Sequence, residues 1–321
     1  MLKTLSRLNP VRAVRTAQRL MDALDRLPEL EAKIEQCMVA YQKDARFADR
    51  LPAFQSRIDI GRVRAHLRAV VDGAALQREP CPYLVIENLL PEDLYDEMLS
   101  ALPSPVFFKR HDKTREEMQV PFVFAPAFSR LVWDFFMTAV VEETLVPALT
   151  EKFRPVLDEF LAANWPSLGT WEQSKLSLRV GNSRLLLRRP GYVIRPHRDP
   201  RWAFLTCLIY LQKRGADHVY GTQLYRLTQE REATHNSPFW VDERECELVR
   251  DVPGGRNSAL IFLNSTGVHG ASIPPDAPAD LERYVYQAQL SPDEAARRRL
   301  IEMLAVDKKA GWANKGNRDY S

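Results

Sequence analysis

Cysteines are scarce in this sequence and far apart. The chain has 321 residues, and its four cysteines are Cys37, Cys81, Cys207 and Cys246. No two of them form a CxxC pair, which argues against a zinc knuckle and against the disulfide framework of a secreted protein. We therefore expect a protein of a reducing compartment, the cytoplasm.

Long apolar runs and a strong charge imbalance are also missing. No segment approaches the roughly 18 consecutive apolar residues of a membrane span, and the N-terminus lacks the compact apolar region of a signal peptide. The 45 Lys and Arg residues nearly balance 42 Asp and Glu residues, so bulk charge does not predict a nucleic-acid partner. Residues 1–21 carry five basic side chains before the first acid. A solvated helix explains such a pattern more often than a transit peptide or membrane-surface helix does.

The composition that remains is that of a folded protein. Hydrophobic residues make up 45% of the chain and charged residues 27%, and the length allows one large domain with helical additions or two ordinary domains. We predict three parts. Residues 1–75 form a helical N-terminal extension, 76–290 form a β domain with a leading strand and helices, and 291–321 form a C-terminal helix and tail.

The N-terminal part has a helical stripe between residues 20 and 41. Apolar side chains recur there every three or four positions, which places them on one helical face. They are Leu20, Leu24, Leu27, Leu30, Ile34, Cys37 and Tyr41. Pro28 predicts a break, with the proline in the first turn of a second helix. The stripe could join two copies into a homo-oligomer or pack on the chain's own core.

Short strands dominate the second half of the chain. A strand at 81–86, a helix opened by Pro91 and a long helix at 135–161 precede them. Alternating or apolar runs then follow one another with turn signals between them, at 185–187, 191–194, 204–211, 222–227, 248–252, 259–263 and 284–290. Successive strands without intervening helices predict an antiparallel sandwich or closed barrel. Ser291, Pro292 and Glu294 predict the N-terminus of a final helix, with Ser291 as its N-cap.

Two histidines and one carboxylate form the candidate metal site. His197 and Asp199 are two positions apart, so in a strand both side chains face the same side, and a second strand could bring His269 to them. Two His and one carboxylate leave three positions open on an octahedral ion, as in non-haem Fe(II) oxygenases. By itself a His-x-Asp pair arises easily by chance, so the surrounding pattern must decide.

That surrounding pattern resembles a known family. In chain order stand Arg188-Arg189-Pro190-Gly191, Pro196-His197-Arg198-Asp199, Leu205-Thr206-Cys207-Leu208-Ile209-Tyr210-Leu211, Gly221-Thr222-Gln223-Leu224, Val252-Pro253-Gly254-Gly255-Arg256, His269 and Arg283. Residues 80–290 thereby resemble the iron(II)- and 2-oxoglutarate-dependent oxygenases, especially the prolyl-4-hydroxylase-like branch. The resemblance implies a mainly β fold with α elements, in which a double-stranded β-helix (jelly-roll) core is flanked by N-terminal helices and a C-terminal helix.

The resemblance also implies the roles of individual residues. His197, Asp199 and His269 would hold Fe(II), Arg283 would bind the far carboxylate of the cosubstrate 2-oxoglutarate, and Thr206 would supply a hydroxyl donor. Arg188 stands where many relatives have Tyr, so it would either add a second cation or face outward. The implied reaction consumes O₂ and hydroxylates an unactivated C–H bond of a small polar molecule or peptidyl side chain, with succinate and CO₂ as coproducts.

Two other functions fit the same residues. A zinc hydrolase also uses two His, a carboxylate and an open position, but has no need of an oxoglutarate anchor such as Arg283. A cupin-like protein that binds a metal or small ligand without catalysis is the third possibility.

Arg195, Arg198 and Arg201 around the metal motif favour a small polar or anionic substrate over nucleic acid, unless they point outward. The remaining histidines are interpreted as surface or loop residues, at positions 66, 111, 218 and 235.

Overall fold

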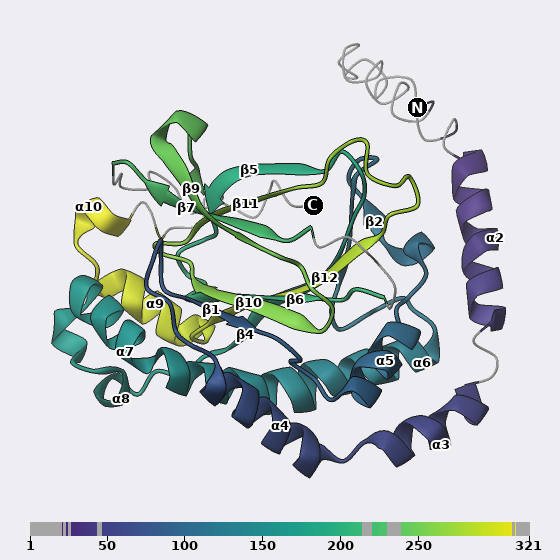
Figure 1. Cartoon of the computed structure of the whole chain (residues 1–321), viewed down its shortest axis with the longest axis horizontal. Coiled ribbons are helices and arrows are strands. Elements are labelled where there is room, and N and C mark those ends of the chain that lie inside the picture. The colour runs from purple at the N-terminus through teal and green to yellow at the C-terminus, as the bar shows by residue number, and fades with distance from the viewer. Residues whose placement is uncertain are drawn as a thin grey trace, which may run out of the picture.

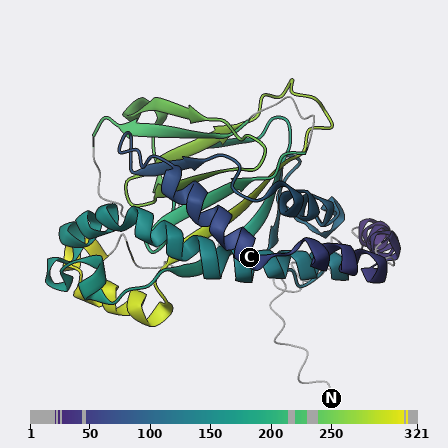
Figure 2. The same cartoon turned by 60° about the horizontal axis from the view of Figure 1, so that its bottom comes forward.

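The computed structural model describes residues 21, 24, 27–43, 47–213, 220–229, 239–309 and 312. Its described part has three layers. A smaller β-sheet faces a larger one, and a layer of long helices covers the other side of the larger sheet (Figures 1 and 2). The fold is therefore mainly β with α, built on two antiparallel sheets, as the sequence predicts.

The larger sheet has seven described strands in the order β1-β10-β6-β12-β4-β3-β2, and all neighbours are antiparallel. These strands are β1 (Tyr83–Ile86), β2 (Lys109–Arg110), β3 (Arg115–Gln119), β4 (Arg179–Arg188), β6 (Leu205–Tyr210), β10 (Ser258–Leu263) and β12 (Arg283–Ser291). The long β4 and β12 pair along almost their whole length. Strand β12 is the central strand of this sheet, and β4 connects it to the edge formed by β3 and β2.

The smaller sheet has five described strands in the order β8-β5-β11-β7-β9, again antiparallel. They are β5 (Val193–Arg198), β7 (Thr222–Leu227), β8 (Phe239–Trp240), β9 (Cys246–Val252) and β11 (Val268–Ser272). The predicted metal ligands His197 and His269 thus lie on two neighbouring strands at the middle of this sheet.

Along a strand of the larger sheet, alternate side chains face either the hydrophobic core or the space between the two sheets. In β4, Leu185 and Leu187 are fully buried in the main hydrophobic core, which includes the helices. Arg184, Leu186 and Arg188 alternate with them and line a cavity between the sheets. Because successive side chains of a strand point to opposite faces, Arg184 and Arg188 face the smaller sheet.

The helical layer is formed mainly by one long run between residues 127 and 164. It comprises α6 (Ala127–Phe135), the π-helical segment η4 (Phe136–Leu145) and α7 (Val146–Asn164), beside α4 (Ile60–Gly73) and α5 (Glu92–Ser100). Large side chains such as Trp133 and Phe153 are completely buried in the main core. The predicted helix at 135–161 is thus the middle of a longer helical run. The short helices are η3 (Pro105–Phe107), η5 (Pro166–Leu168), α8 (Trp171–Ser174), η6 (Glu243–Glu245) and α10 (Val306–Lys309).

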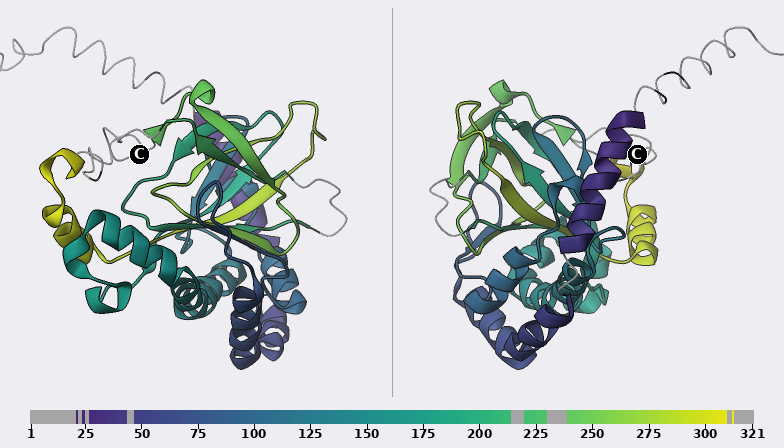
Figure 3. Two further views of the ribbon diagram at one scale, coloured as in Figure 1. Left: turned by 60° about the vertical axis from the view of Figure 1, so that its left-hand side comes forward. Right: turned by 90° about the vertical axis from the view of Figure 1, so that its right-hand side faces the viewer.

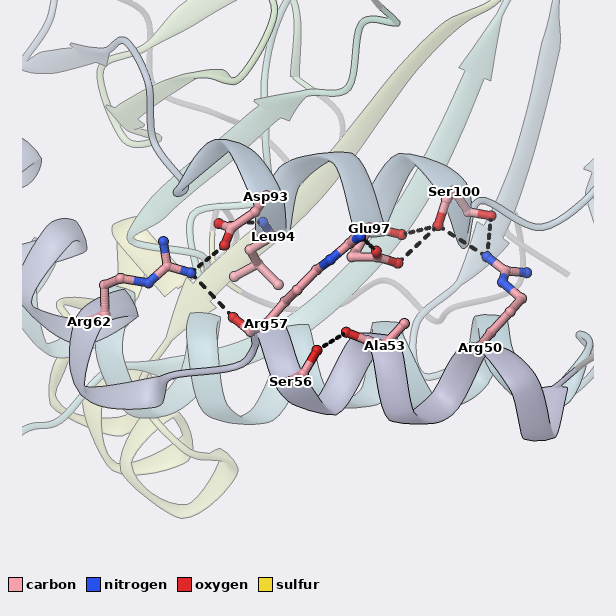
Figure 4. A network of polar contacts seen from close by, with 9 residues as sticks. All are labelled: Arg50, Ala53, Ser56, Arg57, Arg62, Asp93, Leu94, Glu97 and Ser100. Carbon is pink, nitrogen blue, oxygen red and sulfur yellow. Dashed lines mark hydrogen bonds and ion pairs between the residues drawn. The ribbon is translucent and has the colours of Figure 1, made fainter.

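The N-terminal helices α3 (Phe47–Arg57) and α4 belong to the main core. Phe54 and Leu67 are almost fully buried within it. Polar contacts add to this packing, as Figure 4 shows, because Arg62 Nη2 lies 2.6 Å from Asp93 Oδ2 of α5, and Arg57 pairs with Glu97. The boundary near residue 75 stays a prediction, although residues 47–73 pack on the same core as the sheets.

Helix α2 (Leu27–Lys43) contains Pro28, but residues 25 and 26 just before it lie outside the described part of the chain, so the predicted break near Pro28 stays a prediction. The helix stands beside the body of the molecule (Figures 1 and 3). Tyr41 contacts Phe107 edge-on at 5.4 Å between ring centroids, whereas Ile34 and Leu27 of the stripe are about half exposed. Homo-oligomerisation through residues 20–41 stays a prediction, and the basic segment 1–20 lies outside the described residues.

The C-terminal helix α9 (Glu294–Met303) starts two residues later than the sequence suggests. Its N-cap is Asp293, whose side chain accepts a hydrogen bond from the Ala296 N–H at 2.8 Å. Ser291 was the wrong choice because it is the last residue of β12 and still pairs with Arg179.

Among the described residues, no helix combines the length and the apolar character that crossing a membrane requires.

Candidate metal and anion site

The two predicted histidine ligands meet across a strand pair. His197 on β5 and His269 on β11 are register partners, and their ring centroids are 4.2 Å apart. Asp199 follows directly after the end of β5. Its Oδ1 lies 3.9 Å from His197 Nε2, and its Oδ2 lies 4.0 Å from His269 Nε2. One ligand atom from each residue falls within 4.8 Å of the others, which is a separation that a single ion can bridge.

Hydrogen bonds orient both imidazoles toward the shared point. His197 Nδ1 lies 2.8 Å from the Arg195 carbonyl oxygen, and His269 Nδ1 lies 3.2 Å from the Gly267 carbonyl oxygen. A carbonyl oxygen can only accept, so each Nδ1 carries a proton, and in the neutral ring the Nε2 then keeps its lone pair. Both lone pairs are therefore available beside Asp199.

Burial keeps His197 neutral and therefore able to ligate. Its side chain is 6% exposed. Burial and the neighbouring His269 lower the pKa of His197 to about 4. At neutral pH the imidazole is consequently unprotonated, as metal ligation requires.

Asp199 is held as a carboxylate by the larger sheet. Thr206 Oγ1 donates to Asp199 Oδ2 at 2.9 Å. Burial alone would raise the pKa of Asp199, but the nearby His269 and His197 and hydrogen bonds from Thr206 and Gln289 lower it overall. A buried anion that faces the Nε2 atoms of two imidazoles is stabilised by a cation between them. The donor set of two nitrogens and one oxygen fits the facial triad of a non-haem Fe(II) site.

A cavity of about 250 Å³ opens beside these three residues. One part of its wall is polar and comes mainly from the larger sheet, namely from Arg115, Arg184, Arg188, Arg283, Gln287 and Thr222. Another part is apolar and comes from both sheets, namely from Leu186, Ile194, Leu208, Trp240, Ala271 and Val285. The volume is close to the lower end of typical ligand pockets, roughly 300–1,000 Å³, so the cavity suits small molecules.

Arg283 is a largely buried cation in this wall. Its Nε donates to the Tyr220 carbonyl at 2.6 Å and its Nη2 to the Gly221 carbonyl at 2.8 Å. Burial lowers the pKa of Arg283, and the neighbouring Arg188 lowers it further, yet a guanidinium stays charged at neutral pH. No carboxylate within the described residues pairs with Arg283. An unpaired buried charge of this kind favours the binding of an anion.

Arg188 faces the cavity and not the solvent. It is the register partner of Arg283 on the neighbouring strand and is 8% exposed. Its Nη1 donates to the main-chain carbonyls of Glu116 and Leu187 at 2.7 and 3.1 Å, whereas its Nε is buried without a hydrogen-bond partner. Of the two orientations that the sequence allowed, the structure has the inward one.

Two glycines of the motifs are required by close backbone contact beside Arg283. A Cβ on Gly221 would lie 1.7 Å from the Val252 carbonyl oxygen, and one on Gly254 would lie 2.5 Å from the Tyr220 carbonyl oxygen. The carbonyls of Tyr220 and Gly221 are the ones that hold Arg283. These glycines therefore allow the approach of two segments that orient the arginine.

Other predicted residues lie elsewhere. Thr206 contacts Asp199, so its predicted contact with a cosubstrate stays a prediction. The cavity is not lined by Arg195, Arg198 or Arg201. Their expected role in substrate binding depended on their position around the cavity, so that expectation loses its support. Arg195 is exposed, with its guanidinium 5.7 Å from the centroid of the Trp240 ring.

Of the four remaining histidines, the two that the structure describes, His66 and His111, do not join the metal cluster. His66 Nε2 lies 2.7 Å from the Asn88 carbonyl oxygen, and His111 Nε2 lies 3.2 Å from Glu117 Oε1. Both contacts fit the predicted surface and loop roles. His218 and His235 lie outside the described residues.

Sequence reasoning missed several cavity residues, namely Arg115, Arg184, Gln287 and Trp240. A signal was available for two of them. Arg184 shares strand parity with Arg188, and Gln287 shares it with Arg283, so each should face the same side as its partner. Arg115 could not be found in this way, because the segment after His111 read as a charged loop.

Comparisons with known proteins give structural matches alone. No protein-family model matches the chain, and no curated protein matches it. Solved structures that match include a Pseudomonas putida prolyl-4-hydroxylase, with 17% identity, a TM-score of 0.38, and coverage of 71% of this chain and 99% of that one. An oxidoreductase of the 2OG-Fe(II) oxygenase family from Burkholderia pseudomallei has 11% identity, covers 73% and 91%, and has a TM-score of 0.38.

A third match is the epimerase SnoN in complex with Fe3+, alpha-ketoglutarate and nogalamycin RO. It has 13% identity, covers 72% of this chain and 83% of that chain, and has a TM-score of 0.39. The matched structures thus come from the class that the sequence motifs resemble. Because all three are distant, we base the function on the residues of the site itself.

Proposed function

We propose that the chain is an Fe(II)- and 2-oxoglutarate-dependent dioxygenase that hydroxylates an unactivated C–H bond of a small polar molecule or peptidyl side chain. One observation carries this proposal. The buried cluster of His197, Asp199 and His269 shares a cavity with Arg283, a buried cation that no described carboxylate neutralises. The two antiparallel sheets would then correspond to a double-stranded β-helix core, and we expect a cytoplasmic enzyme.

Different residues of the chain would bind the iron and the cosubstrate. His197, Asp199 and His269 would hold Fe(II) through one face, which leaves positions for the cosubstrate and O₂. Arg283 would bind the far carboxylate of 2-oxoglutarate in a charge-assisted contact, with Arg188 as a second cation beside it. Bound iron would supply the activation of O₂, and succinate and CO₂ would be the coproducts. The apolar wall would exclude water from the reacting C–H bond.

A zinc hydrolase fits this cavity less well. Its ligands would be the same, but Arg188 and Arg283 would then be two adjacent buried cations without a function. Such an arrangement costs several kcal/mol per charge unless an anion is present. A dicarboxylate cosubstrate accounts for them directly.

The decisive experiment begins without oxygen. Addition of Fe(II) and 2-oxoglutarate to the anaerobic protein should produce the weak visible charge-transfer band of an iron-bound 2-oxo acid, and Asp199→Ala should produce none. Admission of O₂ should then release succinate. A protein that gives no band, or that hydrolyses esters or amides with zinc and forms no succinate with iron, would contradict the proposal.

A further inference from the structure

Three arginines form a row across the larger sheet where it lines the cavity. Arg115 on β3 is the register partner of Arg188 on β4, and Arg188 is the register partner of Arg283 on β12. Paired residues of neighbouring strands point to the same face, and neighbouring strands lie about 4.8 Å apart. The row therefore spans about 10 Å. All three side chains line the cavity that contains His197 and Asp199.

The charges of this row exceed what the cosubstrate can neutralise. Arg115 has a partner, because its Nε lies 2.6 Å from Asp112 Oδ2. Arg188 and Arg283 have no carboxylate partner within the described part of the chain. If the proposed function is correct, the near carboxylate of 2-oxoglutarate and Asp199 balance Fe(II), and the far carboxylate balances one guanidinium. One buried positive charge then remains, and a second anion would neutralise it.

Guanidinium donors without a partner among the described residues lie in the middle and at the outer end of the row, on Arg188 and Arg115. Arg188 uses Nη1 for main-chain carbonyls, and its buried Nε has no partner. Asp112 accepts hydrogen bonds from the Thr114 N–H and hydroxyl, both at 2.8 Å, and so fixes the Nε edge of Arg115. Neither Nη atom of Arg115 donates to a described residue. Arg188 and Arg115 together thus present a pair of guanidinium groups beyond Arg283.

The neighbouring arginine in the wall is already neutralised. Arg184 donates from Nη1 to Glu117 Oε2 at 3.2 Å and from Nη2 to Gln287 Oε1 at 3.0 Å. It therefore contributes shape and polarity and little net charge. Next to it the wall is apolar, with Leu186 on β4 and Ile194 on β5. A ligand that fills this space needs an apolar body and one anionic end.

We infer that the oxidised substrate carries an anionic group, a carboxylate or a phosphate monoester, that Arg188 and Arg115 bind while 2-oxoglutarate occupies Arg283. The inference rests on the proposed function, because that function assigns 2-oxoglutarate to Arg283. Arg188, in the middle of the row, lies between the two anions. The apolar body of the substrate would lie along Leu186 and Ile194, within the same cavity as the metal ligands.

The test uses anaerobic protein loaded with Fe(II) and 2-oxoglutarate, so that nothing turns over. Methyl phosphate and ¹³C-labelled acetate are titrated separately, and binding is followed by broadening of the ³¹P or ¹³C signal by the paramagnetic iron. At least one probe should bind while the visible band of the iron-bound cosubstrate persists. Binding of acetate alone indicates a carboxylate substrate, and binding of methyl phosphate alone indicates a phosphate ester.

Matched variants locate the bound probe. Arg115→Gln should weaken its binding on the order of tenfold to a hundredfold, the expected loss of a charge-assisted hydrogen bond, and should leave the visible band unchanged. Arg110→Gln is the control, because Arg110 is an exposed residue of the adjacent strand β2 that does not line the cavity. It should bind the probe as the unaltered protein does.

Several results would overturn the inference. They are failure of both probes to bind, loss of the visible band as the probe binds, and equal binding by Arg115→Gln and the unaltered protein. Each of these leaves the proposed function intact if the band forms. Absence of the band before any probe is added would instead contradict the proposed function, and the inference would fall with it.

Discussion

Thr206 illustrates how a single side chain orients a proposed metal ligand, Asp199. The sequence resemblance assigned its hydroxyl to the cosubstrate, whereas in the structure the hydroxyl donates to Asp199. Residues that hydrogen-bond to metal ligands fix their orientation and tune their affinity for the ion. Thr206 is fully buried, so no water can replace its hydroxyl group.

We therefore expect Thr206→Val to weaken Fe(II) binding about 10- to 100-fold. The 2-oxoglutarate requirement, measured at saturating iron, should change little. Equilibrium dialysis of iron and succinate formation at varied 2-oxoglutarate separate the two effects. Thr222→Val is the matched control, since Thr222 lines the cavity but accepts its hydrogen bond from Tyr210. A selective increase in the 2-oxoglutarate requirement would restore the role that the resemblance implied.

Substitution of Arg283 should affect the 2-oxoglutarate requirement much more than iron binding, which is the opposite of what we expect for Thr206→Val. Arg283→Ala removes the unpaired cation, so the 2-oxoglutarate requirement should rise on the order of tenfold to a hundredfold, with a much smaller change in iron affinity. Arg188→Ala should give a milder change. Arg195→Ala, at an exposed position outside the cavity, serves as the control. Equal losses of iron and 2-oxoglutarate affinity would show that Arg283 has a structural role.

At the scale of elements, helices α3 and α4 are attached to the body by apolar contacts such as Phe54 of α3 and by polar contacts such as Arg62 of α4, which differ in strength. Phe54 is 1% exposed and packs edge-on against Phe128 and Phe135, whereas the ion pair of Arg62 and Asp93 is largely in solvent. Burial of an aromatic ring in a close-packed core stabilises far more than an exposed ion pair does.

Phe54→Ala should consequently lower the free energy of unfolding by about 3–5 kcal/mol. Arg62→Ala should lower it by about 0.2–1 kcal/mol. Urea denaturation followed by circular dichroism measures both. Comparable values for the two variants would mean that polar contacts hold α3 and α4 and that these helices are peripheral to the core.

The elements also show what the sequence could and could not predict. Strands β6, β7 and β10 coincide with predicted runs to within a residue at each end, because apolar patterning and turn residues define strands that are paired on both sides. Strand β3 was not predicted. Its sequence Arg115–Gln119 is polar, and it becomes a strand by pairing with β4, a long-range contact that local pattern does not contain. The meeting of His197, Asp199 and His269 followed from strand parity and resemblance, but the arginine row required the register.

At the scale of the whole molecule, the site connects the two sheets. His197 and His269 come from the smaller sheet, whereas Thr206 and Arg283 come from the larger one. A ligand that binds the folded state at 100 times its dissociation constant stabilises it by about 2.7 kcal/mol. Because this site spans both sheets, that stabilisation should affect the cooperative unfolding of the entire β region.

Anaerobic Fe(II) with 2-oxoglutarate should therefore raise the Tm by several degrees, roughly 2–4 °C for each kcal/mol in a chain of about this size. EDTA should reverse the increase, and Asp199→Ala should show none. Differential scanning calorimetry provides the measurement. An unchanged Tm in the unaltered protein at saturating ligand would mean that the cluster does not bind metal in the folded state.

The separation of tasks between the sheets has an evolutionary consequence. The histidines belong to the interior of the smaller sheet, whereas Arg115 belongs to β3, next to the short edge strand β2 of the larger sheet. Substitutions at position 115 can therefore accumulate without disturbing the proposed iron ligands. After gene duplication, one copy could acquire a new substrate through a few changes at this edge while inheriting its oxidation chemistry unaltered. A laboratory library that randomises positions 115 and 184 would exploit the same separation.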